Sequence, residues 1–294
     1  MNLQTYPVAH ATPLPVPKDF NGSFLAPTSS AHLQRNQELV NIDDNQVWVL
    51  SSQGYTAGLA KSLAKTCSAF PLRIWIVDNS GSMHKPDGHR MVETGDTSVM
   101  KMVDCTRWAE LRECIAYHIK MAGLLQATSH FRLLNNPGAN VGSQEFGVAA
   151  SSHGMIPQEV DTAMRIIQQA SPSGSTPLTQ HVREIHRIVQ NMAPDLVANG
   201  HRVSIVLATD GLPTDSFGVG GTVQNQEFVD SLRLLEGLPV WVVIRLCTDE
   251  DQVVEFYNDL DEQLELSLEV LDDFVGEANE VYQYNSWLTY GLPL

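Results

Sequence analysis

The sequence predicts an α/β fold of the Rossmann-like kind: a doubly wound, mostly parallel sheet of six strands, with helices on both faces and one short antiparallel strand. Three observations predict it. Apolar runs of strand length alternate with longer segments of helical period from residue 72 onward. The runs at 72–77 and 201–208 are apolar almost throughout, as in strands that are covered on both faces. A chain of 294 residues that is 43% hydrophobic and 18% charged can also bury one large core.

The expected elements follow one another in the order that such a sheet requires. An amphipathic helix at 54–70 ends before Pro71, and the first strand, 72–77, follows directly. The remaining expectations are a helix at 106–127, short strands at 129–134 and 144–149, helices at 158–169 and from Pro177, a strand at 201–208, a helix at 224–235, a strand at 239–247, a helix at 249–263, a mixed edge strand at 264–271 and a last helix at 272–284.

Composition divides the chain into three parts. Residues 1–44 contain several prolines among polar residues and predict an extended arm, and residues 45–71 form a helical lead-in. Residues 72–290 form the α/β domain. This domain contains an insertion at 83–103, in which strand-like alternation on both sides of Thr94-Gly95-Asp96 predicts a small hairpin overhanging the sheet edge.

The acidic balance of the chain limits the partners that it can bind. A net charge of −16 and a pI near 4.9 argue against nucleic acid and anionic lipid, which recruit basic patches, whereas they suit a cation. No apolar run approaches the ~20 residues that cross a bilayer, and residues 1–19 do not resemble a signal peptide. We therefore expect a cytoplasmic protein without membrane insertion, whose four scattered cysteines are reduced.

Three segments rich in oxygen donors fall where strands are expected to end or helices to begin: 78–82 (DNSGS), 174–178 (GSTPL) and 209–211 (TDG). Ligands of open α/β sheets bind at the carboxyl ends of the strands. Two carboxylates and three hydroxyls without nitrogen or sulfur suit a hard cation such as Mg²⁺ or Mn²⁺. Gly81 is expected to let the first loop bend. The candidate ligands are Asp78, Ser80, Ser82, Thr176 and Asp210.

The order of these motifs resembles the metal-ion-dependent adhesion site of von Willebrand factor A domains. The likeness covers residues 70–287: D-x-S-x-S after the first strand, a threonine in S-G-S-T-P-L, and T-D-G after a central strand. It implies that Ser80 and Ser82 bind the ion directly, and that Asp78 and Asp210 act through water or hydrogen bonds. Thr176 would bind directly in the ligand-ready state. A glutamate or aspartate of a partner protein would fill the open position.

The resemblance also implies a non-enzymatic, protein-binding role and a conformational switch. In such domains the helix after the last strand can slide when the threonine changes between direct and water-mediated binding, and here that helix corresponds to 272–284. The side chains expected on the partner-binding rim are Asn79, Met83, His84, Ser175 and Leu212.

Other interpretations stay open at this stage. The motif residues are also common turn and capping residues, and His84, Asp87 and His89 are either a second metal site or solvated loop residues. Hydrolase chemistry at Ser80 lacks both G-x-S-x-G and an assignable base. A role as a subunit of an ATPase-linked assembly would need a partner for nucleotide chemistry, because the chain has no G-x-x-x-x-G-K-[ST] loop.

Overall fold

The computed structural model describes residues 42–93, 100–248, 250–271 and 282–284. Nearly all of the predicted arm, 1–44, lies outside these residues. The predicted last helix, 272–284, also lies outside them apart from Tyr282 to Tyr284, which are helical. None of the helices in the described ranges is long and apolar enough to span a membrane.

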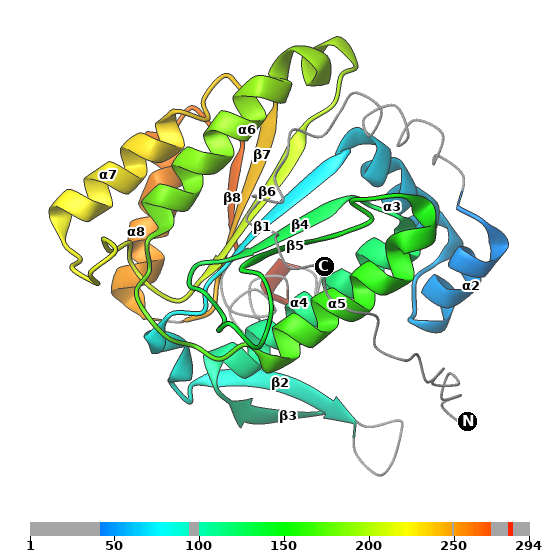
Figure 1. Cartoon of the computed structure of the whole chain (residues 1–294), viewed down its shortest axis with the longest axis horizontal. Helices are drawn as coiled ribbons and strands as arrows, with labels where there is room; N and C mark the ends of the chain where they lie inside the picture. The colour runs from blue at the N-terminus through cyan, green and yellow to red at the C-terminus, as the bar shows by residue number, and fades with distance from the viewer. Residues whose placement is uncertain (1–41, 94–99, 249, 272–281, 285–294) are drawn as a thin grey trace.

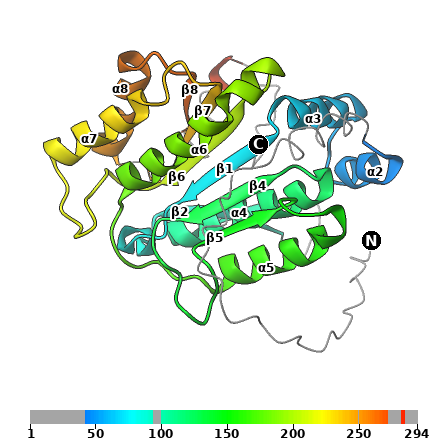
Figure 2. The same ribbon diagram turned by 45° about the horizontal axis from the view of Figure 1, so that its top comes forward.

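The six-stranded sheet has the order β5-β4-β1-β6-β7-β8. All neighbouring strands are parallel except the pair β4–β5. Helices α4 and α5 cover one face, and α6, α7 and α8 cover the other (Figures 1 and 2). The predicted fold class is therefore confirmed. The strands are β1 (Leu72–Val77), β4 (Ser129–Leu133), β5 (Glu145–Val148), β6 (Val203–Thr209), β7 (Val240–Leu246) and β8 (Leu268–Leu271).

Alternation along the strands sends side chains into two cores. Ile74 and Ile76 face α6 (Leu178–Ala198), α7 (Thr222–Arg233) and α8 (Asp251–Gln263). Trp75 and Val77, one position out of phase, face α4 (Arg107–Leu125) and α5 (Ile156–Gln169). Because apolar residues occupy both faces of β1, this strand reads in the sequence as an unbroken apolar run.

Two helices precede the sheet. Helix α3 (Ala57–Ala69) matches the predicted helix, whereas α2 (Asp44–Ser52) was not predicted as a separate element. Asp43 and Gln46 form a reciprocal capping box at the start of α2. The Gln46 side chain also donates to the Leu124 carbonyl over 2.6 Å, which attaches α2 to the end of α4.

The insertion forms the predicted hairpin, made of β2 (Gly88–Glu93) and β3 (Met100–Cys105) after a short 3-10 turn, η2 (Gly81–His84). Gly88 lies so close to the start of α4 that a Cβ there would be 2.9 Å from the Arg107 nitrogen. The base of the hairpin is thus packed on the N-terminus of α4, near the carboxyl end of β1 (Figure 1).

Some details differ from expectation. Pro177 is the N-cap of α6 rather than part of its first turn. The predicted edge strand at 264–271 is present but shorter, as β8, which pairs in parallel with β7; the one predicted antiparallel strand is β5, which pairs with β4. Trp241 of β7 remains 36% exposed although the run at 239–247 is mostly apolar, because alternate residues of β7 point to the less covered face.

Candidate metal centre

The first and third motifs meet at one edge of the sheet because β1 and β6 are parallel neighbours that end together. The Asp78 nitrogen donates to the Ala208 carbonyl over 2.9 Å. One Asp78 carboxylate oxygen, Oδ2, accepts a 2.6 Å hydrogen bond from the Thr209 hydroxyl. The other, Oδ1, accepts from the Ser80 nitrogen over 2.7 Å and thereby shapes the loop that follows β1.

A chain of hydrogen bonds links the two serines to the second carboxylate. The Ser82 hydroxyl donates to Asp210 Oδ1 over 2.8 Å, and the hydroxyl oxygens of Ser80 and Ser82 are 2.9 Å apart. Asp78, Ser80 and Asp210 are buried, whereas Ser82 is partly exposed. The structure therefore brings together four of the five predicted ligands, with Ser82 nearest to solvent.

The fifth predicted ligand, Thr176, lies in a loop that is hydrogen-bonded to the loop after β1. The Gly81 nitrogen donates to the Gly174 carbonyl over 3.1 Å, and the Ser173 nitrogen donates to the Asn79 carbonyl over 2.7 Å. Thr176 is 6% exposed. Within the described ranges, no hydrogen bond joins its hydroxyl to the other four side chains.

The glycine on which this arrangement depends is Gly174 rather than Gly81. Gly174 has a φ of +84°, and a Cβ there would lie 2.4 Å from the Asn135 amide oxygen. A Cβ at Gly81 would meet only the Gly174 carbonyl at 3.7 Å, and Gly81 has no positive φ. The expectation that Gly81 is needed for the bend is therefore wrong.

The spacing of the oxygens fits a hard cation. Ligands at about 2.0–2.1 Å in octahedral geometry, as Mg²⁺ prefers, lie about 2.9 Å from their neighbours. The Ser80–Ser82 and Ser82–Asp210 oxygen pairs are separated by 2.9 and 2.8 Å. These separations are also ordinary for O–H···O hydrogen bonds, so they are compatible with an ion beside Ser80, Ser82 and Asp210 without selecting one.

The sequence did not predict the role of Arg107, a buried arginine beside the site. Its Nη1 lies 3.0 Å from Asp210 Oδ2, and its Nη2 lies 2.6 Å from Asp87 Oδ2 and 2.7 Å from Glu250 Oε1. Lys85 also pairs with Glu250. Arg107 thus connects the metal-site carboxylate with the segment before the hairpin and the residue that caps α8.

Arg107 occupies the first position of α4, where the helix dipole disfavours a positive charge. An arginine at the start of a predicted helix is therefore the feature of the sequence that could have indicated carboxylates around it. Burial alone lowers the pKa of Arg107, but its hydrogen bonds to Asp87, Glu250 and Asp210 outweigh burial and raise the pKa above its ordinary value.

Within the described ranges, Asp78 has no basic side chain paired with its carboxylate. Burial, together with the negative charge of Asp210, raises the pKa of Asp78 to about 6, although hydrogen bonds from Thr209 and Ser80 act in the opposite direction. A nearby cation favours the ionised form of a carboxyl group in this position. Asp78 and Asp210 together can carry two negative charges, and Arg107 balances only one of them, so a further positive group is electrostatically favourable here.

Two of the five side chains expected on the partner-binding rim are buried. Met83 is 0% exposed and belongs to the core beneath α4. Asn79 is also 0% exposed, because its amide is bonded to the backbone of Asn135 in both directions, over 2.8 and 3.0 Å. These two predictions are corrected. Ser175 and Leu212 are partly accessible and His84 is exposed.

The suggested second metal site has no support. The His84 ring faces the Pro172 carbonyl at 3.1 Å, Asp87 pairs with Arg107, and His89 lies 3.7 Å from Asp104. Across the described ranges, no group of three or more His, Cys, Asp and Glu side chains is arranged to hold a metal ion. The candidate centre at the sheet edge has only two carboxylates and depends on hydroxyl oxygens.

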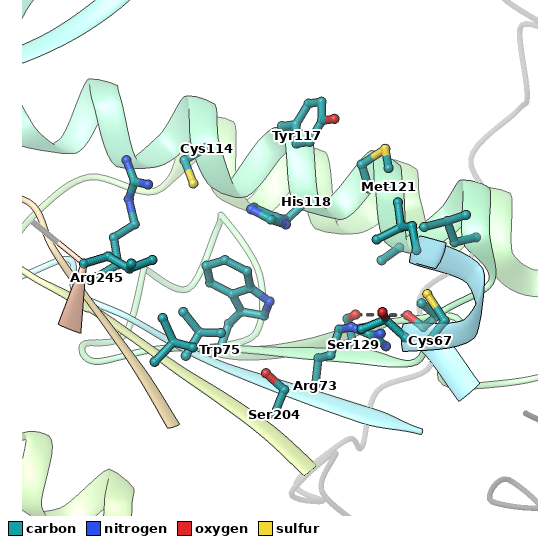
Figure 3. A pocket seen from close by; sticks show the side chains of 18 of the residues that line it. Cys67, Arg73, Trp75, Cys114, Tyr117, His118, Met121, Ser129, Ser204 and Arg245 are labelled. Carbon is teal, nitrogen blue, oxygen red and sulfur yellow. Dashed lines mark hydrogen bonds between the residues drawn. The ribbon is translucent and has the colours of Figure 1, made fainter. Parts of the chain in front are cut away.

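A separate cavity of about 300 Å³ lies between α3, α4 and the sheet. Figure 3 shows the His118 ring over Trp75, with Arg245 and Arg73 at opposite ends of the space. Burial lowers the pKa of His118 to about 3, and the charges of Arg245 and Arg73 act in the same direction. Leu271 of β8 also lines this cavity.

No protein-family model and no curated protein sequence matches the chain. Among solved structures, the fold is similar to that of the PilB minor pilin from Streptococcus sanguinis, with 12% identity and a TM-score of 0.44 over 68% of this chain. An aspartate-to-alanine mutant of the same pilin gives 13% identity and the same TM-score. The chain spans 56% of the pilin's length in both cases.

Proposed function

We propose that this chain is a metal-ion-dependent protein-binding domain of the von Willebrand factor A type. In this proposal Ser80, Ser82 and Thr176 hold Mg²⁺ or Mn²⁺, and Asp78 and Asp210 orient the serines and balance the charge. The ion's remaining position accepts an aspartate or glutamate of a partner protein. The single observation that carries the proposal is the convergence of Ser80, Ser82 and Asp210, from two distant segments, into one chain of oxygen atoms of the kind that a hard cation prefers.

The charge of the surroundings favours a bridging role for the ion. Arg107 already neutralises part of the charge of Asp210. A divalent ion bound beside one free carboxylate and one paired carboxylate keeps a net positive field, so an acidic group from outside is attracted to it. The partial exposure of Ser82 gives such a group a side from which to approach.

The surroundings of Ser80 favour binding over catalysis. Its hydroxyl faces the hydroxyl of Ser82, and within the described ranges no histidine is hydrogen-bonded to it. A nucleophilic serine needs a base within hydrogen-bond reach. We therefore propose a non-enzymatic role.

Titration calorimetry of the full chain with Mg²⁺ and Mn²⁺ tests the proposal. One site per chain is expected, and Ser80→Ala and Asp78→Asn are expected to weaken it by at least about tenfold, since each removes an oxygen or a charge from the centre. Ser152→Ala, in a loop beyond β5, is the control and should bind as the natural chain does. Equal affinity in all four proteins would refute the proposed centre.

A further inference from the structure

An exposed apolar tip lies beside the candidate metal centre. Phe217 is 90% exposed, and Val219 and Val223 are 56% and 65% exposed. They belong to the turn between β6 and α7 and to the first residues of α7, at the same edge of the sheet as η2 (Figures 1 and 2). A large aromatic side chain in this degree of contact with water marks a contact surface rather than a contribution to folding.

The turn that carries Phe217 is held in one conformation. The Asp215 carboxylate accepts hydrogen bonds from the nitrogens of Phe217 and Val219 over 2.8 and 2.9 Å. The Asp215 nitrogen donates to the Val219 carbonyl over 2.9 Å, and Thr214 forms a bridge with Gly220. Presenting Phe217 to a partner would therefore require little ordering of the backbone.

The turn is also fastened to the loop that carries Thr176. The Thr176 nitrogen donates to the Thr214 hydroxyl, and the Thr214 nitrogen donates to the Thr176 carbonyl, each over 2.9 Å. A Cβ on Gly218 would lie 3.8 Å from the Ser175 side chain. The apolar tip and the candidate metal centre thus form one continuous surface.

A hollow that contains two exposed arginines borders the turn on its other side. The hollow lies between α6 and α7, has a volume of about 360 Å³, and is lined by Arg183 and Arg187 together with Ser216 of the turn. Both arginines are exposed, and within the described part of the chain neither forms an ion pair. Asp215 and Glu227 also line the hollow, but the Asp215 carboxylate already accepts two backbone hydrogen bonds, so the two arginines are groups that an acidic residue of a partner could pair with.

From this continuity we infer that the partner is an acidic segment that also carries a large apolar side chain. One carboxylate would reach the metal ion, the apolar side chain would pack on Phe217, and a further acidic residue would lie near Arg183 and Arg187. The inference rests on the proposed metal-dependent function. Beyond that function, it specifies the kind of partner sequence that the site binds.

Selection from a library of randomised twelve-residue peptides with one fixed central glutamate, on the immobilised full chain in Mg²⁺, tests the inference. Enriched peptides are expected to carry a large apolar residue at a constant distance from the glutamate, and further acidic residues. Phe217→Ser should weaken their binding about tenfold or more, as for a central aromatic contact. The combined change Arg183→Glu and Arg187→Glu should weaken it similarly and reduce its salt dependence.

Two controls separate surface effects from unfolding. Val197→Ser removes an apolar side chain of similar exposure at the far end of α6, and Arg202→Glu reverses a charge at the opposite edge of the sheet. Both should leave peptide binding unchanged. Calorimetric Mn²⁺ binding should be the same in Phe217→Ser as in the natural chain, because Phe217 is not a ligand.

The outcomes distinguish this inference from the proposed function. Mg²⁺-dependent peptides that bind Phe217→Ser with full affinity would overturn the acidic-apolar partner and leave the metal-dependent function intact. Failure to enrich any peptide would also overturn it. Whether the natural chain binds Mn²⁺ at all is measured separately, and absence of that binding would refute the proposed metal-dependent function. A concentration-dependent dimer that Phe217→Ser abolishes would instead assign the tip to a second copy of this chain.

Discussion

At the scale of single residues, Arg107 decides the charge of the candidate centre. It is almost fully buried and touches three carboxylates that come from distant parts of the chain. Buried arginines in such positions hold their partners in place more than they add net stability, because desolvation offsets much of the attraction. Removing the arginine leaves the carboxylates behind without compensation.

We predict that Arg107→Gln lowers the free energy of unfolding by about 3–5 kcal/mol, since it strands the buried Asp210 carboxylate. Mg²⁺ should restore part of this loss, because the ion supplies the missing positive charge. Urea denaturation with and without Mg²⁺ measures both effects. Arg233→Gln, which breaks only an exposed pair with Asp230, should cost at most about 1 kcal/mol and should leave the Mg²⁺ effect unchanged. A smaller Mg²⁺ effect in Arg107→Gln than in the natural chain would contradict this account.

Gly174 and Gly81 form a matched pair in adjoining loops. Gly174→Ala places a side chain at a φ of +84° and against Asn135, so we predict a loss of about 1–3 kcal/mol in the free energy of unfolding. Gly81→Ala meets only an ordinary contact and should change it by less than about 0.5 kcal/mol. Urea denaturation of both variants checks the prediction, and equal losses would show that the Thr176 loop is not held in this conformation.

At the scale of elements, α4 joins the metal centre to the cavity on the same face of the sheet. Its first residue is Arg107, and His118 lies three turns later against Trp75. The His118 ring faces Arg245 and Arg73, whose charges together with burial keep it neutral. The protonation state of His118 therefore depends on how α4 packs against this face of the sheet.

We predict that His118 makes the protein less stable in mild acid. Its pKa is about 3 in the folded chain and ~6.5 in the unfolded chain, so between these values only the unfolded state takes up the proton. The free energy of unfolding then falls as the pH falls from ~6.5 toward 3, and this contribution is absent above ~6.5.

Urea denaturation at pH 7 and pH 5 measures this effect. His118→Gln should reduce the fall by up to about 1.4 kcal/mol per pH unit. His181, whose pKa burial lowers to about 4, should keep its own share of the fall in that variant. An identical pH dependence in His118→Gln and in the natural chain would mean that the ring is accessible to solvent when the protein is folded.

Elements whose signal is local were predictable from the sequence, and elements that depend on tertiary contacts were not. The strand at 72–77 was predicted to the residue, because a strand buried on both faces is apolar at every position. Helix α2 falls in the predicted helical lead-in at 45–71, but it was not separated from α3, because the capping pair Asp43 and Gln46 was not recognised as a helix start. The exposure of Trp241 was not predictable, because an apolar run does not reveal which face of a sheet is less covered.

The same division applies to the candidate centre. Asp78 and Asp210 could be paired from the sequence, because parallel strands end at one edge of the sheet. Asp87 and Glu250 could not, since the hairpin insertion and the β7–α8 connection bring them to Arg107 through packing. Asn79 and Met83 were placed on the surface because motif position does not determine where a side chain points.

At the scale of the whole molecule, one edge of the sheet gathers most of the unusual chemistry. The hydroxyl-carboxylate chain, the buried arginine, the exposed Phe217 and the hollow with two unpaired arginines in the described chain all lie at or next to the carboxyl ends of β1 and β6. We therefore place the proposed partner-binding surface at this edge.

The most direct test of the central claim is anomalous diffraction from a crystal of the full chain soaked in Mn²⁺. The account predicts one strong anomalous peak within about 2.0–2.3 Å of the hydroxyl oxygens of Ser80 and Ser82, on the side from which Thr176 approaches. A crystal with no peak there at saturating Mn²⁺, or with the Arg107 guanidinium filling that position, would contradict it.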